Sequence, residues 1–359
     1  MRMAADGIGV KRDLSQIQEL IGPALLHPVV DKQNGRAIIW LMPDLTQFFG
    51  LPSLGRQRAD VLVLPLPIEK TVCYGTGAAS GPRAIVEATI QVETFDEETL
   101  VEFADSPRIH VLPPVSADGD LEACLSRISD EVRSLRASSP DKFLLFLGGE
   151  HSVTYGVIGG LVDDPAEVTI VQLDAHGDLA DKLGGRHWSH GTVMRRLCER
   201  GCRLMQIGIR SVTRDEYDVA ASSPRITTYY SHRLGDCPNF RLSENGTVPL
   251  DVPPASQSTS QWPELLDALR RLQGKVYLTV DVDGLDPSII PSTGTPQPGG
   301  LSWRQTMDIF RVLMGESQCQ LIGADVVEFV ASPIPPGCDP AAARLTTKLL
   351  AWWWKGRSP

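Results

Sequence analysis

VTIVQLDAHGD, residues 168–178, joins an apolar run directly to a cluster of acidic and histidine side chains. The run does not alternate regularly between polar and apolar residues, which is typical of a strand that is covered on both faces. Asp174, His176 and Asp178 follow at once. Because residues two apart in an extended segment point the same way, these three side chains are predicted to face a common centre.

Five further apolar runs of the same kind follow this pattern along the chain. They are VLVLPLP (61–67), FLLFLGG (143–149), LMQIGIR (204–210), VYLTVDVD (276–283) and LIGADVVEF (321–329). Segments with helical signals lie between them; one is SWRQTMDIFRVLM, in which Gln305 follows Ser302 by three residues, as in a capping box. Strands that alternate with helices predict an α/β fold built on one parallel sheet.

Potential metal ligands recur where the predicted strands end. His151 follows the run at 143–149, and Glu328 closes the run at 321–329. Asp281 and Asp283 close the run at 276–283. In open α/β sheets, ligands bind outside the carboxyl ends of the strands, so all these side chains are predicted to meet at one rim.

Carboxylates and imidazoles gathered in this way need a compensating positive charge, because like charges a few ångströms apart raise one another's pKa. Mixed ligation of this kind suits Mn²⁺, with Fe²⁺, Co²⁺, Ni²⁺ or Zn²⁺ as alternatives. Six ligands are enough for two ions about 3.5–4 Å apart. Each motif alone is also compatible with a solvated loop or an Asp-Pro turn. Their repetition after several strands favours a metal centre.

The composition restricts the function classes. Lys and Arg total 34 and Asp and Glu total 44, which gives a formal net charge of −10. An acidic chain disfavours binding to nucleic acid or membranes and weakly favours cationic small molecules. We find neither a membrane-spanning apolar stretch nor the apolar core of a secretory signal, so we expect a cytoplasmic protein. The seven scattered cysteines are expected to be reduced thiols.

Two parts of different character are predicted along the chain. Residues 1–55 are less regular, with apolar segments that Pro43 and Pro52 interrupt. The alternation of strands and helices begins only at about Ala59. We therefore expect an N-terminal extension at 1–55 and one catalytic domain at 56–359.

Taken together, the motifs resemble the ureohydrolase family, which includes arginase, agmatinase, formiminoglutamase and guanidinobutyrase. The resemblance covers about residues 55–352, in the order of the family. The matching segments are YGTGAASGPRAI (74–85), GGEHS (148–152), DAHGD (174–178), SHGT (189–192), DVDGLDP (281–287) and DVVEF (325–329). It implies a three-layer α/β/α fold with a mostly parallel eight-stranded sheet, the fold that arginases and deacetylases share.

The resemblance also implies a centre of two metal ions, usually manganese, held by aspartates and histidines. One ion would be bound by His151, Asp174, Asp178 and Asp281. The other would be bound by Asp174, His176, Asp281 and Asp283, so that Asp174 and Asp281 bridge. A water activated by both ions, and oriented by Asp178, would attack the guanidinium carbon of the substrate. Urea and an amine would be released.

Three more residues are candidates for contact with the substrate. The resemblance implies that Glu328 pairs with the guanidinium nitrogens and that His190 shuttles a proton near the leaving amine. A structural ion pair for Glu328 and packing within the loop for His190 are the alternatives. Trp188 fits no pattern of the family. We expect it to line the pocket and stack on a cationic substrate, with surface packing as the alternative.

Flanking residues favour the agmatinase branch of the family. Arginases typically carry an Asn two residues beyond DAHxD, and acids in an IGLRDVD-like stretch, which bind the amino-acid head group. This chain has Ala180, Ser211 and Thr213 at those positions. Agmatine, hydrolysed to putrescine in polyamine biosynthesis, is therefore the expected substrate. Aminopropylagmatine, guanidinobutyrate, guanidine and arginine remain open.

Two alternatives come from other function classes. One is a metal-binding scaffold that kept the fold and lost turnover. The other is an amide hydrolase on the deacetylase fold, with a single Zn²⁺. The family resemblance also implies a homo-oligomer, a trimer or a hexamer, because ureohydrolases usually form these assemblies.

Overall fold

The computed structural model describes residues 26–30, 37–41, 47–235, 260–331 and 338–357. The chain divides into two compact units, residues 1–45 and residues 46–359. In the first unit, β1 (Leu26–Val30) pairs in antiparallel fashion with β2 (Ala37–Leu41). The second unit includes residues 47–55, because Phe49 is buried there against Phe103, with ring centroids 4.8 Å apart. The predicted extension at 1–55 lies partly outside the described residues and stays a prediction.

An eight-stranded sheet forms the centre of the second unit. Its strand order is β10-β9-β8-β11-β12-β7-β3-β6, and every neighbouring pair is parallel. The strands are β3 (Val61–Leu66), β6 (Ile109–Val111), β7 (Phe143–Gly148), β8 (Val168–Leu173), β9 (Arg203–Ile209), β10 (Ile226–Tyr230), β11 (Lys275–Asp281) and β12 (Gln320–Val327). The predicted α/β fold is confirmed, and the sheet is parallel throughout. A separate antiparallel pair joins β4 (Phe95–Asp96) to β5 (Val101–Glu102).

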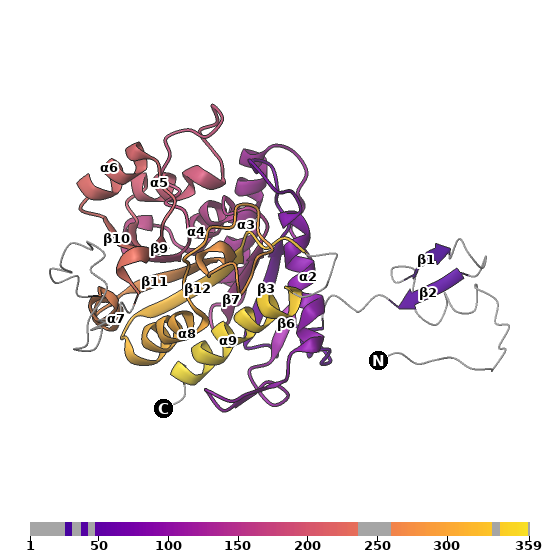
Figure 1. The fold of residues 1–359 in the computed structure, drawn as a ribbon. Helices are drawn as coiled ribbons and strands as arrows, with labels where there is room; N and C mark the ends of the chain where they lie inside the picture. Colours follow the sequence, from indigo (N-terminus) through magenta and orange to yellow (C-terminus); the bar gives the residue numbers. More distant parts are fainter. Residues whose placement is uncertain (1–25, 31–36, 42–46, 236–259, 332–337, 358–359) are drawn as a thin grey trace, which may run out of the picture. The chain divides into compact units, whose positions relative to one another are not determined.

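Helices cover both faces of this sheet and complete the three layers (Figure 1). One face carries α3 (Leu121–Ser138), α4 (Val153–Leu161), α5 (Val193–Glu199) and α6 (Arg214–Ser222). The other face carries α2 (Gly81–Ala88), α7 (Trp262–Arg270), α8 (Trp303–Arg311) and α9 (Asp339–Arg357). No helix within the described part of the chain has both the length and the apolar character that a membrane crossing requires.

Successive residues of each strand enter opposite cores. In β3, Val61 and Val63 belong to the core under α2 and α9, whereas Leu62 and Leu64 belong to the core under α3 and α4. Full burial of such a side chain stabilises the fold by about 1.5–3 kcal/mol. In a strand that is buried on both faces, a polar side chain is tolerated only where it finds a hydrogen-bond partner. The sequences of these strands are therefore nearly continuous apolar runs.

Local signals start the helices as the sequence predicts. The Ser302 hydroxyl accepts a hydrogen bond from the Gln305 backbone N–H at 3.2 Å, and the Gln305 side chain accepts one from the Ser302 N–H at 2.9 Å. This capping box begins α8. Asp120 caps α3 by accepting from the Ala123 N–H at 2.9 Å. Caps of this kind are worth about 1 kcal/mol each.

Four neighbouring strands in the middle of the sheet carry the candidate ligands. Their spatial order is β8-β11-β12-β7. Because all four are parallel, their carboxyl ends lie side by side at one rim. Segments that are far apart in sequence, 148–152, 174–178, 281–283 and 325–328, are thereby brought together.

Close packing behind this rim generates a stability prediction at Gly149. A methyl group on Gly149 would lie 2.1 Å from the Ile68 carbonyl oxygen, so backbone would have to move. We expect Gly149→Ala to lower the free energy of unfolding by about 1–3 kcal/mol in urea titrations. Gly315→Ala is the matched control, because nothing lies within 4 Å of its new methyl group. The control should change the free energy by less than about 1 kcal/mol; equal losses in both variants would refute the packing argument.

Candidate metal centre

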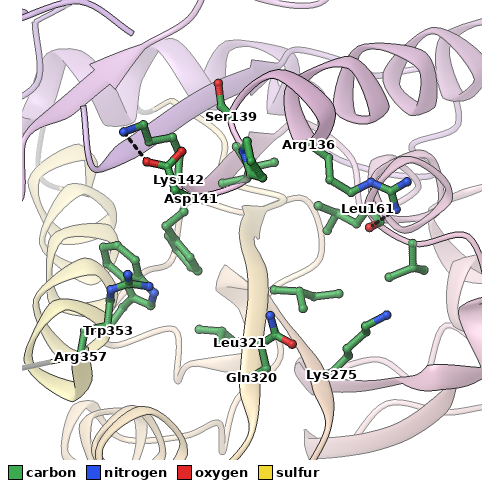
Figure 2. A pocket seen from close by; sticks show the side chains of 15 residues that line it. Arg136, Ser139, Asp141, Lys142, Leu161, Lys275, Gln320, Leu321, Trp353 and Arg357 are labelled. Carbon is green, nitrogen blue, oxygen red and sulfur yellow. Dashed lines mark hydrogen bonds and ion pairs between the residues drawn. The ribbon is translucent and has the colours of Figure 1, made fainter. Parts of the chain in front are cut away.

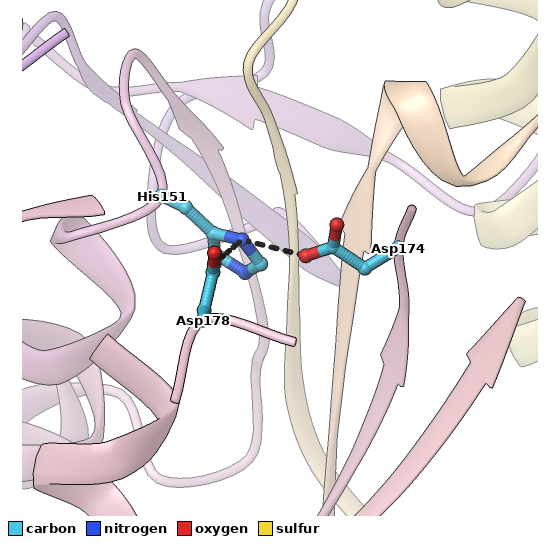
Figure 3. A group of neighbouring side chains, drawn as sticks. All are labelled: His151, Asp174 and Asp178. Carbon is cyan, nitrogen blue, oxygen red and sulfur yellow. Dashed lines mark ion pairs between the residues drawn. The ribbon is translucent and has the colours of Figure 1, made fainter. Parts of the chain in front are cut away.

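One group of ligands surrounds the imidazole of His151 (Figure 3). His151 Nδ1 lies 3.1 Å from Asp174 Oδ2, 3.0 Å from Asp178 Oδ2 and 3.5 Å from Asp281 Oδ2. All four side chains are buried. They come from the turn after β7, the segment after β8 and the end of β11. We call these four residues the His151 cluster.

A second group lies on the other side of Asp174. His176 Nδ1 is 3.0 Å from Asp283 Oδ2 and 3.8 Å from Asp174 Oδ1. We call Asp174, His176 and Asp283 the His176 cluster. Asp174 belongs to both, with Oδ2 toward His151 and Oδ1 toward His176. Asp281 joins the His151 cluster through Oδ2, while its Oδ1 accepts from the Asp283 N–H at 2.9 Å. Its implied bridging role therefore stays a prediction.

The proton of His151 is directed away from the clustered carboxylates. His151 Nε2 is 2.8 Å from the hydroxyl oxygen of Thr279, and that hydroxyl donates its only proton to Asp325 Oδ1 at 2.5 Å. The hydroxyl can therefore only accept from His151 Nε2–H. In the neutral ring, Nδ1 then has a lone pair that faces the carboxylates. Burial opposes the charged ring, but the contacts with Asp174, Asp178 and Asp281 outweigh it and raise the pKa of His151, so without a cation Nδ1 carries a proton that a metal ion would displace. A lone pair that faces three carboxylate oxygens fits a site for a cation.

Burial and mutual repulsion shift the protonation of the clusters. Burial, together with the charges of Asp178 and Asp283, raises the pKa of Asp174 to about 7. Burial also raises the pKa of Glu328 to about 8. Burial opposes the charged form of His176, but the contact with Asp283 outweighs it and raises the pKa of His176 to about 9. Without cations, these groups keep protons that metal binding would displace.

Polar side chains that the motifs do not include hold the ligands in place: Gln172 and Gln206 are buried, and Arg210 is half-buried. The Gln172 amide donates to Asp174 Oδ2 at 2.8 Å and accepts from the Gln206 amide at 2.8 Å. The Arg210 guanidinium donates to the carbonyl oxygens of Asp283 and Gln297 at 2.6 and 2.7 Å. Gln172 and Gln206 could have been found from the sequence, because each is a polar residue inside an otherwise apolar strand and therefore needs a buried hydrogen-bond partner.

Two of the carboxylates stand on strained backbone. Asp178 has φ of 52° and Glu328 has φ of 62°, a left-handed conformation that costs a non-glycine residue about 1–3 kcal/mol. The Glu328 N–H donates to the Gly149 carbonyl at 2.8 Å, and Glu328 Oε1 accepts from the His151 N–H at 2.6 Å. These hydrogen bonds hold the strained residue against the turn that carries His151.

A cavity of about 330 Å³ opens over both clusters. Besides ligands, Glu328 and His190 line it, together with Val72, Cys73, Tyr74, Ala180, Leu183, Gly191, Ser211, Val212, Thr213, Glu216, Gly294 and Thr295. None of the described residues that line it is Lys or Arg. The cavity is thus acidic at its floor and uncharged or acidic along its walls, which suits a cation.

The structure corrects the expectation that Trp188 lines this cavity. Its ring packs edge-on against Tyr155 of α4, with ring centroids 4.6 Å apart. It lines a separate cavity between α3 and α4, beside Arg200. The indole packs against the apolar core beside α4 and not over the metal clusters. Surface packing, which was the alternative expectation for Trp188, therefore describes its position.

A cavity of similar size at the amino ends of β7, β11 and β12 lacks the features of a site (Figure 2). Four cationic side chains line it. Three of them are paired with an acid, and the fourth, Arg357, lies over the Trp353 ring, 5.1 Å from its centroid. The pairs are Arg136 with Asp163, Lys142 with Asp141 and Lys275 with Glu167, at 2.8, 2.8 and 2.6 Å. The pairing neutralises three of these four charges, which weakens the attraction for an anion. We therefore place the functional site at the carboxyl ends of the strands.

Comparison with known proteins identifies the family of this chain. The model of the arginase family matches residues 59–237 and 256–351. An N(1)-aminopropylagmatine ureohydrolase from Synechocystis sp. is 32% identical over 302 residues, which are 82% of this chain and 89% of the relative. An agmatinase from Pyrococcus horikoshii is 28% identical over 82% of this chain and 92% of the relative. The solved agmatine ureohydrolase of Thermoplasma volcanium superposes with a TM-score of 0.66 at 25% identity, over 84% of this chain and 93% of that one.

The raised pKa values predict how the metal-free protein responds to pH. Asp174, Glu328 and His176 bind protons more tightly in the folded chain, so the stability they contribute is lost as pH rises through about 7, 8 and 9. We expect the Tm in EDTA to fall from about pH 6 to about pH 9. Added Mn²⁺ should reverse the fall, because cations replace the protons. Scanning fluorimetry measures both, and a Tm in EDTA that rises with pH would contradict the prediction.

The hydroxyl of Thr279 gives a second prediction. Thr279→Val removes the acceptor that keeps the proton of His151 on Nε2, so we expect Mn²⁺ affinity at the His151 cluster to fall about 10- to 100-fold in calorimetric titrations. Thr279→Ser keeps the hydroxyl and should stay within about threefold of the unchanged protein. A valine variant that binds Mn²⁺ as tightly as the unchanged protein, or a serine variant that binds it as weakly as the valine variant, would contradict this role of the hydroxyl.

Proposed function

This chain belongs to the arginase family, and from that premise we propose that it is a ureohydrolase of the agmatinase type. It hydrolyses a cationic guanidino compound that has no carboxylate, agmatine or its aminopropyl derivative, to urea and an amine. The observation that carries the proposal is the cavity, where carboxylates form the floor and, among the described residues, no cation lines the wall.

The wall of the cavity selects the substrate class. A carboxylate tail, as in arginine or guanidinobutyrate, would meet no Lys or Arg among the described lining residues. Ala180, Ser211 and Thr213 stand where arginases hold the amino-acid head group. Glu216 also lines the cavity, and an acidic wall favours a tail that is neutral or positively charged. The names of the similar relatives agree with this class.

The His151 and His176 clusters would hold two divalent cations, with Asp174 between them. Bound there, the cations supply a water molecule that is deprotonated near neutral pH. We propose Mn²⁺, because mixed carboxylate and imidazole ligands suit it; Ni²⁺, Co²⁺ and Fe²⁺ suit the same ligands. Asp178, at the edge of the His151 cluster, faces the cavity and orients the attacking water by accepting its hydrogen bond.

Glu328 and His190 act on the substrate. The Glu328 carboxylate faces the cavity and would accept two N–H groups of the guanidinium, which fixes the planar carbon over the clusters. His190 lines the wall of the same cavity, where a leaving amine needs a proton. We further propose that the chain forms a homo-oligomer, a trimer or a hexamer, which mass photometry would show directly.

A panel of guanidino compounds tests the proposal. We expect urea from agmatine and aminopropylagmatine after loading with Mn²⁺, and at least tenfold lower kcat/KM for arginine and guanidinobutyrate. Parallel assays with Ni²⁺ identify the metal that supports turnover. Metal analysis should find two ions per chain. Release of acetate from acetylated amines with one Zn²⁺ would favour the deacetylase alternative, and two bound ions without turnover would favour the scaffold.

Glu328→Gln tests the assigned role of that carboxylate. The variant keeps the shape of the side chain but removes the charge that pairs with the guanidinium, so we expect kcat/KM for agmatine to fall about 10- to 100-fold. Glu122→Gln changes an exposed acid outside this cavity and is the matched control. A Glu328→Gln enzyme as active as the control would exclude the role.

A further inference from the structure

We propose that Thr71 is a positioning residue that sets the tautomer of His190. It keeps one ring proton on Nδ1, so that Nε2 faces the cavity as the atom that accepts and returns a proton. The inference rests on the proposed function, since it is there that His190 handles the proton of the leaving amine. Neither the motifs of the sequence nor the predicted ligand set includes Thr71.

Three contacts meet at the hydroxyl of Thr71. Its oxygen is 2.9 Å from Glu150 Oε1, 3.1 Å from the His190 backbone nitrogen and 3.2 Å from His190 Nδ1. A hydroxyl has one proton to donate and two lone pairs that accept. Each of the three contacts must therefore take one of these three places.

The carboxylate of Glu150 decides which contact takes the proton. Glu150 is fully buried and accepts from the N–H groups of Lys70 and Thr71 at 2.6 Å each, and from the Ser152 hydroxyl at 2.6 Å. A carboxylate that accepts from every side has no proton to give, so the Thr71 hydroxyl donates to it. Thr71 is itself 5% exposed, so water has little access to change the arrangement.

The tautomer of His190 follows by elimination. The His190 backbone N–H takes one lone pair of the Thr71 hydroxyl. The second lone pair faces His190 Nδ1, which must carry a proton to make a hydrogen bond there. In the neutral ring, Nε2 then has the free lone pair. It can bind a proton and return it while Nδ1–H stays bonded to Thr71 in both states.

The first test compares two variants at position 71. Thr71→Val keeps the shape and loses the hydroxyl, so His190 samples the inactive tautomer. We expect kcat for agmatine to fall at least tenfold with KM within about twofold, because binding of the guanidinium does not use this contact. Thr71→Ser restores the hydroxyl and should recover kcat to within about threefold. A valine variant within threefold of the unchanged enzyme, or a serine variant as slow as valine, overturns the proposal.

A double-mutant cycle separates positioning from general support of the loop. If Thr71 acts through His190, Thr71→Val should lower kcat no further in a chain that already carries His190→Gln. A structural role would instead lower kcat by the same factor in both backgrounds. Equal factors would therefore overturn the inference.

A spectroscopic test reads the tautomer without turnover. Long-range ¹H–¹⁵N spectra of the full-length protein, labelled in histidine and loaded with diamagnetic Zn²⁺, distinguish Nδ1–H from Nε2–H, and His190→Gln identifies the signal. We expect Nδ1–H in the unchanged protein and in Thr71→Ser, and a mixture in Thr71→Val. An Nε2–H signal in the unchanged protein overturns the inference. If no guanidino compound gives urea, the proposed function fails, while these spectra still decide the tautomer.

Discussion

Repulsion among buried carboxylates is the constraint on which the rest of this structure depends. Two neighbouring parallel strands, β8 and β11, deliver aspartates from their carboxyl ends to one small volume, where they face the imidazoles of His151 and His176. Such a group is stable only when protons or cations occupy the space between its oxygens. The three carboxylate oxygens around Nδ1 of His151 and the raised pKa of Asp174 are both consequences of this crowding. Two bound cations would neutralise this repulsion, and the same two cations would activate the water molecule for hydrolysis.

Two threonine hydroxyl groups, each of which donates its only proton to a carboxylate, determine which ring nitrogen of a neighbouring histidine carries the proton. Thr279 gives its proton to Asp325 and therefore accepts from Nε2 of His151, which leaves Nδ1 for a cation. Thr71 gives its proton to Glu150 and, in the same way, accepts from Nδ1 of His190. We infer that the two histidines, which line the same cavity, are held in opposite tautomers by the same kind of contact. A buried carboxylate behind each threonine makes the choice, because it can only accept.

The backbone of the site is strained at two residues. Asp178 and Glu328 adopt left-handed conformations that are uncommon for residues other than glycine, and both line the cavity. The rigid sheet makes this possible, because strands that are buried on both faces fix the turns that follow them. Helix caps and cores hold the scaffold, and two of the described non-glycine residues with left-handed backbone lie at the rim, where the placement of a carboxylate matters.

Periodicity and short spacing determined much of this protein from the sequence alone. Apolar runs predicted the parallel strands, and the acids and histidines that follow them, such as Asp174 and Asp281, predicted a common metal rim, because these signals act between near neighbours in the chain. The position of Trp188 and the roles of Thr71 and Thr279 were decided only by the tertiary structure. Thr71 and His190 are 119 residues apart, and Thr279 and His151 are 128 apart. A hydrogen bond depends on which partner the fold brings within about 3 Å, and no local pattern records that distance.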